Sequence, residues 1–148
     1  MATEAVNRLR RVAAGAATVD DLGWLSARLG AYLAHPERGI ERALWLDRAP
    51  GEPPWWRAER QRQRDGFIVR LWREHFPDLP AWEAAERIGA VQQRYAAGPW
   101  LHQREQDAPP DDPVSALLWR AMQSGARFPK SRRRIFSILT APEDERLY

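Results

Sequence analysis

Apolar residues recur along this chain at intervals of three and four residues, the spacing that places them on one face of an α-helix. Short segments rich in proline and glycine interrupt the pattern, among them residues 49–54 and 107–113. No segment alternates apolar and polar residues with the β-branched enrichment typical of a strand. The sequence therefore predicts an all-α fold, a helical bundle of six or seven helices.

The length of 148 residues is enough to bury a core and fold as one domain. The break at residues 49–54 could divide the chain, but the 48 residues before it are few for an independent core. We therefore expect a single all-α domain over residues 1–148. Its predicted parts are N-terminal helices in residues 1–48, a central antiparallel helix pair in residues 54–106, and a basic helix-turn-helix-like unit in residues 112–140.

One N-terminal helix is marked by its start. Thr18 followed three residues later by Asp21 resembles a capping box, in which each side chain binds the other residue's backbone N–H. The apolar residues after it recur at the spacing of one helix face, which runs to His35: Leu22, Leu25, Leu29, Tyr32 and Leu33.

Residues 111–139 hold two helix patterns joined by a short connection. Asp112 followed by Pro113 is a cap residue followed by a residue suited to the first helical turn, and Gly125 provides a stop. After a bend, Ser131 can cap a second helix, which ends near residues 140–142.

The charge of this stretch points to an anionic partner. Residues 113–140 contain six basic residues and no acidic residue. A helix N-terminus carries partial positive charge and favours acidic side chains, yet three arginines fill the first turn of the second helix. A phosphate backbone would satisfy both the arginines and the helix end, although an acid from elsewhere in the fold could also do so. The candidate nucleic-acid-binding residues are Arg127, Lys130, Ser131, Arg132, Arg133 and Arg134.

The two helices together resemble a helix-turn-helix unit, in which the second helix presents its first residues to the major groove of DNA. The resemblance implies a DNA-binding protein, which could be regulatory, with RNA as an open alternative. The connection over residues 124–130 is longer than the usual three- or four-residue turn. A competing interpretation is that these arginines are simply exposed to solvent at the helix start. Arginine is the usual basic residue of the whole chain, where it makes up 22 of the 23 basic residues, so arginine alone does not mark a binding site.

Two further features leave other interpretations open. Arg57, Arg60 and Arg64 share a helix face and form a secondary basic face, which could bind phosphate or merely be solvated. Trp55 and Trp56 follow a proline-rich turn and could anchor a protein partner, which would make the protein a helical adaptor or a small subunit of a larger assembly.

Catalytic and metal-binding patterns are not found. The three histidines lie far apart, and no phosphate-binding loop or nucleophile elbow is present, so we expect no enzyme, no metal and no cofactor. No apolar run reaches the 18 or more residues of a membrane span. The lack of cysteine fits a reducing environment, and we expect a cytoplasmic protein without a membrane partner.

Overall fold

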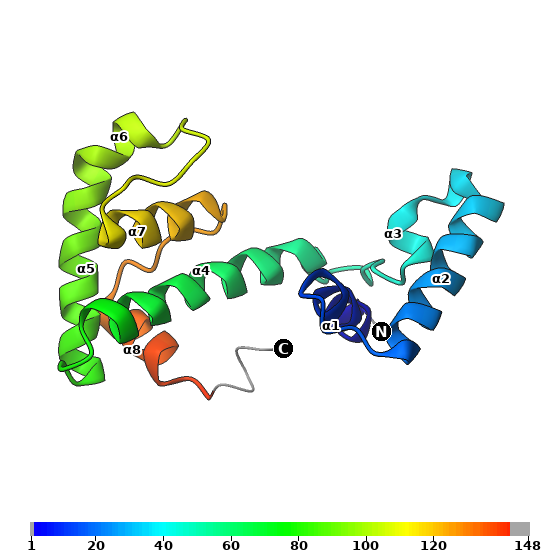
Figure 1. The fold of residues 1–148 in the computed structure, drawn as a ribbon, viewed down its shortest axis with the longest axis horizontal. Coiled ribbons are helices and arrows are strands. Elements are labelled where there is room, and N and C mark those ends of the chain that lie inside the picture. Colours follow the sequence, from blue (N-terminus) through cyan, green and yellow to red (C-terminus); the bar gives the residue numbers. More distant parts are fainter. Residues whose placement is uncertain (1, 143–148) are drawn as a thin grey trace. The chain divides into compact units, whose positions relative to one another are not determined.

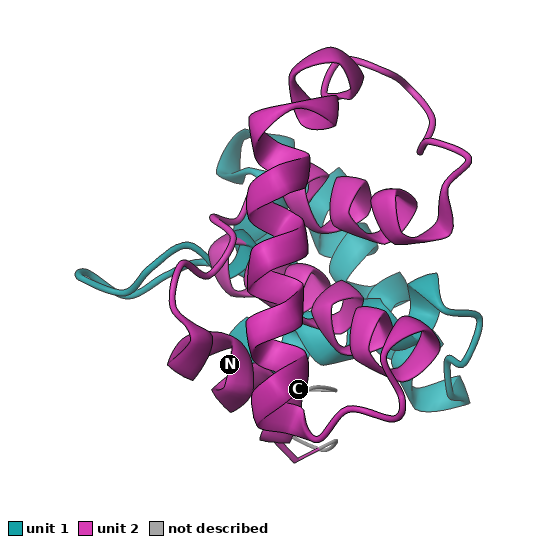
Figure 2. Cartoon of the chain, turned by 90° about the vertical axis from the view of Figure 1, so that its left-hand side faces the viewer, with its two compact units in different colours: residues 1–56, 148 teal, residues 57–147 magenta. Residues whose placement is uncertain are grey.

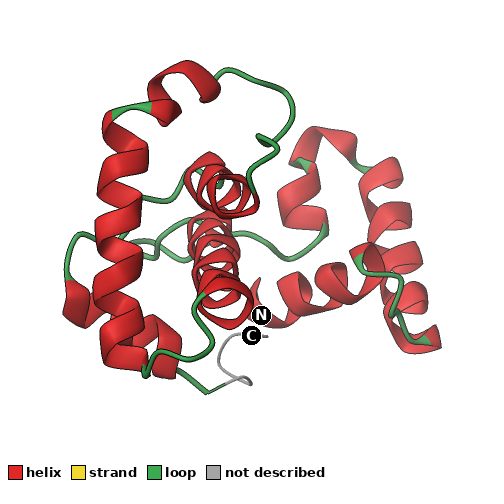
Figure 3. Cartoon of the chain, turned by 60° about the vertical axis from the view of Figure 1, so that its left-hand side comes forward, coloured by secondary structure: helices red, strands yellow, loops and turns green. Residues whose placement is uncertain are grey.

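The computed structural model describes residues 2–142. Helices are the regular secondary structure of this part of the chain, which contains no β-strand (Figures 1 and 3). The all-α prediction is confirmed. In chain order the elements are α1 (Ala2–Ala13), α2 (Val19–Ala34), a 3₁₀-helix η1 (Pro36–Arg38), α3 (Ile40–Ala43), α4 (Trp55–His75), α5 (Ala81–Ala97), α6 (Pro99–Gln103), α7 (Pro113–Gln123) and α8 (Arg132–Thr140).

Polar caps begin the helices where the sequence predicts them. The Thr18 hydroxyl accepts a hydrogen bond from the Asp21 backbone N–H at 3.1 Å, and the Asp21 carboxylate accepts one from the Thr18 N–H at 3.0 Å. This is the reciprocal pair of a capping box at the start of α2. At the start of α7, the Asp112 carboxylate accepts the Ser115 N–H at 2.8 Å. These bonds satisfy backbone donors that have no partner within the helix.

The chain divides into two compact units, one ending at Trp56 and one beginning at Arg57 (Figure 2). The predicted break at residues 49–54 lies just before this boundary. That the chain folds as one domain stays a prediction, because contacts describe packing and not the cooperativity of folding. None of the helices within residues 2–142 is both long and apolar enough to cross a membrane.

The N-terminal unit has a small core. Ala5, Val6, Leu44 and Leu46 are its buried members, and Leu9, Trp24, Leu25 and Trp55 pack against them. The apolar face predicted for α2 is mostly uncovered, since Leu22, Leu29 and Leu33 are exposed and Leu33 keeps 76% of its surface accessible. The small core takes up only the side of α2 that carries Trp24 and Leu25.

The core of the C-terminal unit collects side chains from four helices. Its buried residues include Ile68 and Leu71 of α4, Ala85 and Ile88 of α5, Leu117 and Leu118 of α7, and Ile135, Ile138 and Leu139 of α8. The most extensive helix–helix contact is between α5 and α8. Helix α5 therefore forms the support against which the basic C-terminal helix is held.

The predicted antiparallel pair of α4 and α5 is not what the structure shows. The two helices do not lie side by side along their length (Figure 1), and α5 packs mainly against α8. The corner between α4 and α5 is held by the Trp72 indole N–H, which donates to the Leu79 carbonyl at 2.9 Å. A short connection limits how far apart two helices lie, but it does not decide their crossing angle, which follows from the side chains that interdigitate.

Candidate nucleic-acid interface

Helix α8 is oriented by its apolar side. Ile135, Ile138 and Leu139 are buried in the core, which leaves Arg133 and Arg134 on the exposed side. At the start of the helix the Ser131 hydroxyl accepts the backbone N–H of Arg134 at 3.2 Å, as expected for a cap. Ser131 therefore serves the helix end itself, and the exposed arginines stand beside it.

Arg132 is bound within the protein. Its Nε donates to the Trp82 carbonyl at 3.1 Å, and its Nη1 forms an ion pair with Glu86 Oε2 at 3.0 Å. The guanidinium carbon also lies 4.2 Å from the centroid of the Trp82 ring, within the range of a cation–π interaction. The acid that the helix start requires is thus supplied by α5. The Arg132 side chain is therefore engaged within the protein, unlike those of the other arginines of the predicted site.

Four basic side chains of the predicted site stay exposed: Arg127, Lys130, Arg133 and Arg134. Within residues 2–142 these four side chains have no ion pair and donate no hydrogen bond. Like charges without counterions repel one another, so their grouping within eight residues is unfavourable for the isolated fold.

Two of these four side chains line a groove. Arg127 and Lys130 face α5 across a hollow of about 750 Å³, which is also lined by Gln92 and Gln93 of α5 and by Phe128. Cationic and amide donors thus share one concave surface. This combination suits a phosphate-bearing strand, because guanidinium, ammonium and amide groups all donate to phosphate oxygens.

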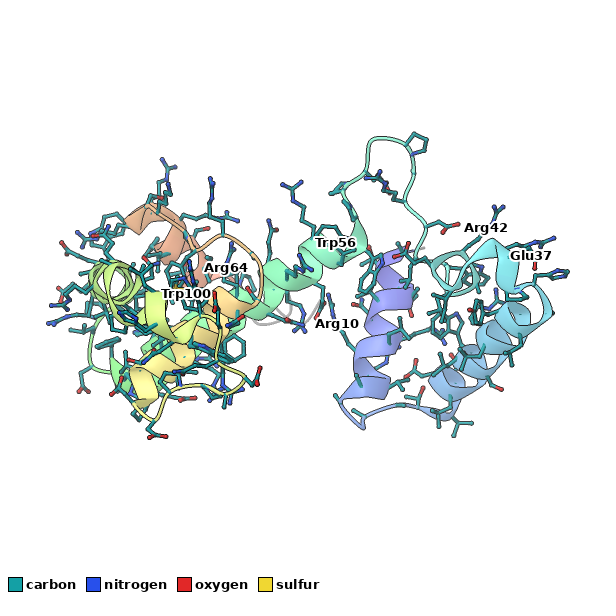
Figure 4. All side chains as sticks on the ribbon, turned by 90° about the horizontal axis from the view of Figure 1, so that it is seen from above. Arg10, Glu37, Arg42, Trp56, Arg64 and Trp100 are labelled. Atoms are coloured by element: carbon teal, nitrogen blue, oxygen red, sulfur yellow. The ribbon has the colours of Figure 1, made fainter. Side chains whose placement is uncertain are left out.

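One residue of the secondary basic face, Arg64, is bound within the protein. Arg64 keeps only 6% of its surface exposed, and its Nη1 donates to the Arg127 carbonyl at 2.5 Å. Its Nε and Nη2 bind Asp65 Oδ1 at 2.8 and 2.6 Å. Arg64 is therefore corrected from a phosphate ligand to a residue that holds the backbone of the groove. Figure 4 labels Arg64 on α4.

The other two arginines of that face lie on the surface. Arg60 is exposed but packs on the chain after α7, where a Cβ added to Gly125 would lie 3.3 Å from Arg60 Nη1. Gly125 has a φ of +80°, which favours glycine at this turn. Arg57 is exposed. Only part of the predicted face is thus available to a ligand.

The two adjacent tryptophans, Trp55 and Trp56, lie in different environments. Trp55 packs against the core of the N-terminal unit, and its indole N–H donates to Glu41 Oε1 at 3.2 Å. Trp56, the next residue, keeps 42% of its surface exposed. A role as partner anchor stays a prediction, and Trp55 has a structural role in any case.

The partners of Arg132 and Arg127 could not be found from the sequence. Trp82 and Glu86 precede Arg132 by 50 and 46 positions, and Arg64 precedes Arg127 by 63. No local spacing links residues so far apart. The glutamines of the groove carry no sequence pattern that would mark them as ligands.

Comparison of the chain with protein-family models, with curated proteins and with solved structures finds no match. Within residues 2–142 no group of three or more histidine, aspartate or glutamate side chains is placed to hold a metal ion. The exposed cations and their surroundings are therefore the features of the protein that bear on its function.

Proposed function

We propose that the protein binds nucleic acid through its phosphate backbone, at the start of α8 and in the adjoining groove. The observation that carries the proposal is the set of four exposed cations without partners within residues 2–142: Arg127, Lys130, Arg133 and Arg134. By contrast, the neighbouring Arg132 and the buried Arg64 are engaged inside the protein. A polyanion would neutralise several of the free cations at once.

The geometry favours contact with the backbone over insertion of a recognition helix. Helices α7 and α8 are joined by residues 124–131, and α8 has only nine residues, with its apolar side packed in the core. Its N-terminus carries partial positive charge beside Arg133 and Arg134, which suits a phosphate group. Duplex DNA is the proposed ligand, and RNA shares the same backbone chemistry.

Salt dependence of binding provides the test. Fluorescence anisotropy of labelled duplex DNA, duplex RNA and single strands is measured over a series of salt concentrations. Each phosphate contact that is lost should lower the slope of log affinity against log salt by about 0.9. Changing both Arg133 and Arg134 to alanine should therefore reduce the slope by roughly 1.8 for the true ligand.

The matched control removes the same charge elsewhere. Arg48 and Arg104 are exposed and lie outside the proposed interface, so the variant with both changed to alanine should keep the slope of the parent protein. An equal loss in the control would show that only net charge matters. Absence of binding by the parent to every labelled nucleic acid at low salt would refute the proposal.

A helical adaptor is the second candidate, and the uncovered apolar face of α2 favours it. Leu22, Leu29 and Leu33 are exposed on one helix, and together with Trp56 they could contact a protein partner. Under this proposal, changing Leu29 and Leu33 to serine removes the partner in a pull-down and leaves nucleic-acid affinity as in the parent. Nucleic acid that copurifies with the protein, detected by its ultraviolet absorbance, would favour the first candidate.

A further inference from the structure

The N-terminal unit contains a pocket that is independent of the nucleic-acid interface. Its volume is about 360 Å³, and it lies between the second half of α2 and the segment from η1 to residue 47. Its charged and aromatic lining comprises Arg28, His35, Arg38, Arg42, Trp45 and Asp47. Figure 4 labels Arg42 and, close in sequence to this lining, Glu37. The size is at the lower end of the range for small-molecule sites.

Arg28 lines this pocket and has a hydrogen-bond donor without a partner. Its Nε is buried and has no hydrogen-bond partner, while its guanidinium carbon lies 4.1 Å from the centroid of the Trp45 ring. Stacking on the ring occupies the flat face of the guanidinium and leaves its edge donors available. A buried donor without an acceptor is unfavourable. The Nη groups of the same guanidinium make no hydrogen bond within residues 2–142, and they could donate to an oxyanion in the pocket.

Trp45 adopts a backbone conformation that favours glycine. Its φ is +57°, and it follows the last turn of α3, where its N–H donates to the Arg42 carbonyl and the Leu46 N–H donates to the Glu41 carbonyl. These two hydrogen bonds form a helix C-terminal motif in which the left-handed residue is usually glycine.

The side chain of Trp45 is not buried in the core, so burial of the ring does not offset the unfavourable backbone conformation. Its neighbours Leu44 and Leu46 are buried, whereas Trp45 keeps 42% of its surface exposed and contacts Arg28. Strained residues of this kind persist where the surrounding structure holds them, and they cluster at ligand sites. The ring thus forms a wall of the pocket and orients Arg28.

The charges around the pocket favour a doubly charged ligand. Arg28 and Arg42 have no ion pair within residues 2–142. The Nε of Arg38 lies 3.9 Å from Glu37 Oε1, and the Nδ1 of His35 lies 3.3 Å from the same oxygen. Asp47 is the acidic side chain of the lining and would oppose an anion.

We propose that this pocket binds a small phosphate monoester. Arg28 and Arg42 would donate to the phosphate oxygens, and the exposed part of the Trp45 ring would contact the organic group. A monoester carries nearly two negative charges at neutral pH, which matches the two unpaired guanidinium groups. An internal phosphate of a nucleic acid carries one charge, so this site is distinct in chemistry from the interface on α8.

The test follows the indole N–H signal of Trp45 by NMR, with the signal assigned through a Trp45→Phe variant. Phenyl phosphate, inorganic phosphate and benzoate are titrated at equal ionic strength. Phenyl phosphate should shift the signal saturably in the parent protein. In the Arg28→Gln and Arg42→Gln variants its affinity should fall at least about tenfold, the loss expected for one charge-assisted hydrogen bond.

Arg48→Gln is the matched control, because Arg48 belongs to the same unit but does not line the pocket. It should bind phenyl phosphate as the parent does. If circular dichroism shows that the Arg28 variant is unfolded, the exposed Arg42 decides the result. Unchanged affinity in the folded variants, equal affinity for benzoate, or the lack of any saturable shift in the parent protein would overturn the proposal.

Discussion

Arg132 and Arg133 are adjacent in sequence, and the structure predicts that their removal has opposite effects on stability. Arg132 makes an ion pair with Glu86, a hydrogen bond to the Trp82 carbonyl and a cation–π contact with the Trp82 ring. Arg133 is exposed and makes none of these contacts. We therefore expect Arg132→Ala to lower the free energy of unfolding and Arg133→Ala to leave it unchanged or slightly raised.

The magnitude follows from the three contacts of Arg132. An exposed ion pair contributes about 0.2–1 kcal/mol, a hydrogen bond about 0.5–1.5 kcal/mol, and an exposed cation–π contact about 0.5–1 kcal/mol. Removing a positive charge from a helix start raises the free energy of unfolding by about 0.3–0.5 kcal/mol. The contributions of the three contacts are not additive. The net loss for Arg132→Ala should be about 1–2 kcal/mol, which lowers the melting temperature by roughly 5–10 °C for a unit of this size.

For Arg133→Ala, loss of the unfavourable interaction with the helix dipole should raise stability by about 0.3 kcal/mol. Urea unfolding monitored by circular dichroism measures both variants. A double-mutant cycle of Arg132 with Glu86 isolates the ion pair, whose coupling should be about 0.2–1 kcal/mol. The same variants separate the binding roles: Arg133→Ala should lower the salt slope of nucleic-acid binding by about 0.9, and Arg132→Ala should not lower it.

Two results would refute this reasoning. An Arg132→Ala variant as stable as the parent protein would mean that Arg132 does not make its contacts with α5 in solution. A loss of stability in Arg133→Ala as large as that in Arg132→Ala would mean that Arg133 has a structural partner. In that case the exposed cations of the proposed interface would be part of the fold.

Three further predictions concern other parts of the molecule. Arg64→Met should lower the free energy of unfolding by about 1–3 kcal/mol, because the Arg127 carbonyl loses its donor, and thermal unfolding measures the loss. Trp45→Gly should be more stable than Trp45→Ala by about 1 kcal/mol in urea unfolding, since both lose the ring but only glycine relieves the positive φ; equal stabilities would contradict the strain. The pKa of Asp21 is held well below its usual range by hydrogen bonds from Arg11 and from the Thr18 backbone. Its stabilising contribution should be complete above the unfolded pKa of about 3.9 and decline as the pH falls toward the folded value, and Asp21→Asn should weaken this acid sensitivity in unfolding measured against pH.

The positions of the helices could be predicted from the sequence because their causes are local. The Thr18 and Asp21 caps of α2, Asp112 before α7 and Ser131 before α8 each bind backbone groups within three residues. Hydrophobic spacing and breaks then mark how far each helix extends. The exposure of the α2 leucines and the packing of α5 against α8 instead of α4 depend on contacts between helices, which no local pattern shows.

The amino-acid order is enough to show that residues 113–140 carry six basic side chains and no acid, with three arginines at a helix start. Which of those cations lack a partner within residues 2–142 depends on the fold, because the partners come from other helices. Glu86 of α5 pairs with Arg132, and Arg64 of α4 binds the Arg127 backbone. The pocket beside Trp45 is likewise decided by folding, since it depends on a stacked arginine and a positive φ that no local pattern marks. Charge is a property of composition, whereas the availability of a charge to a ligand depends on every side chain that packs around it.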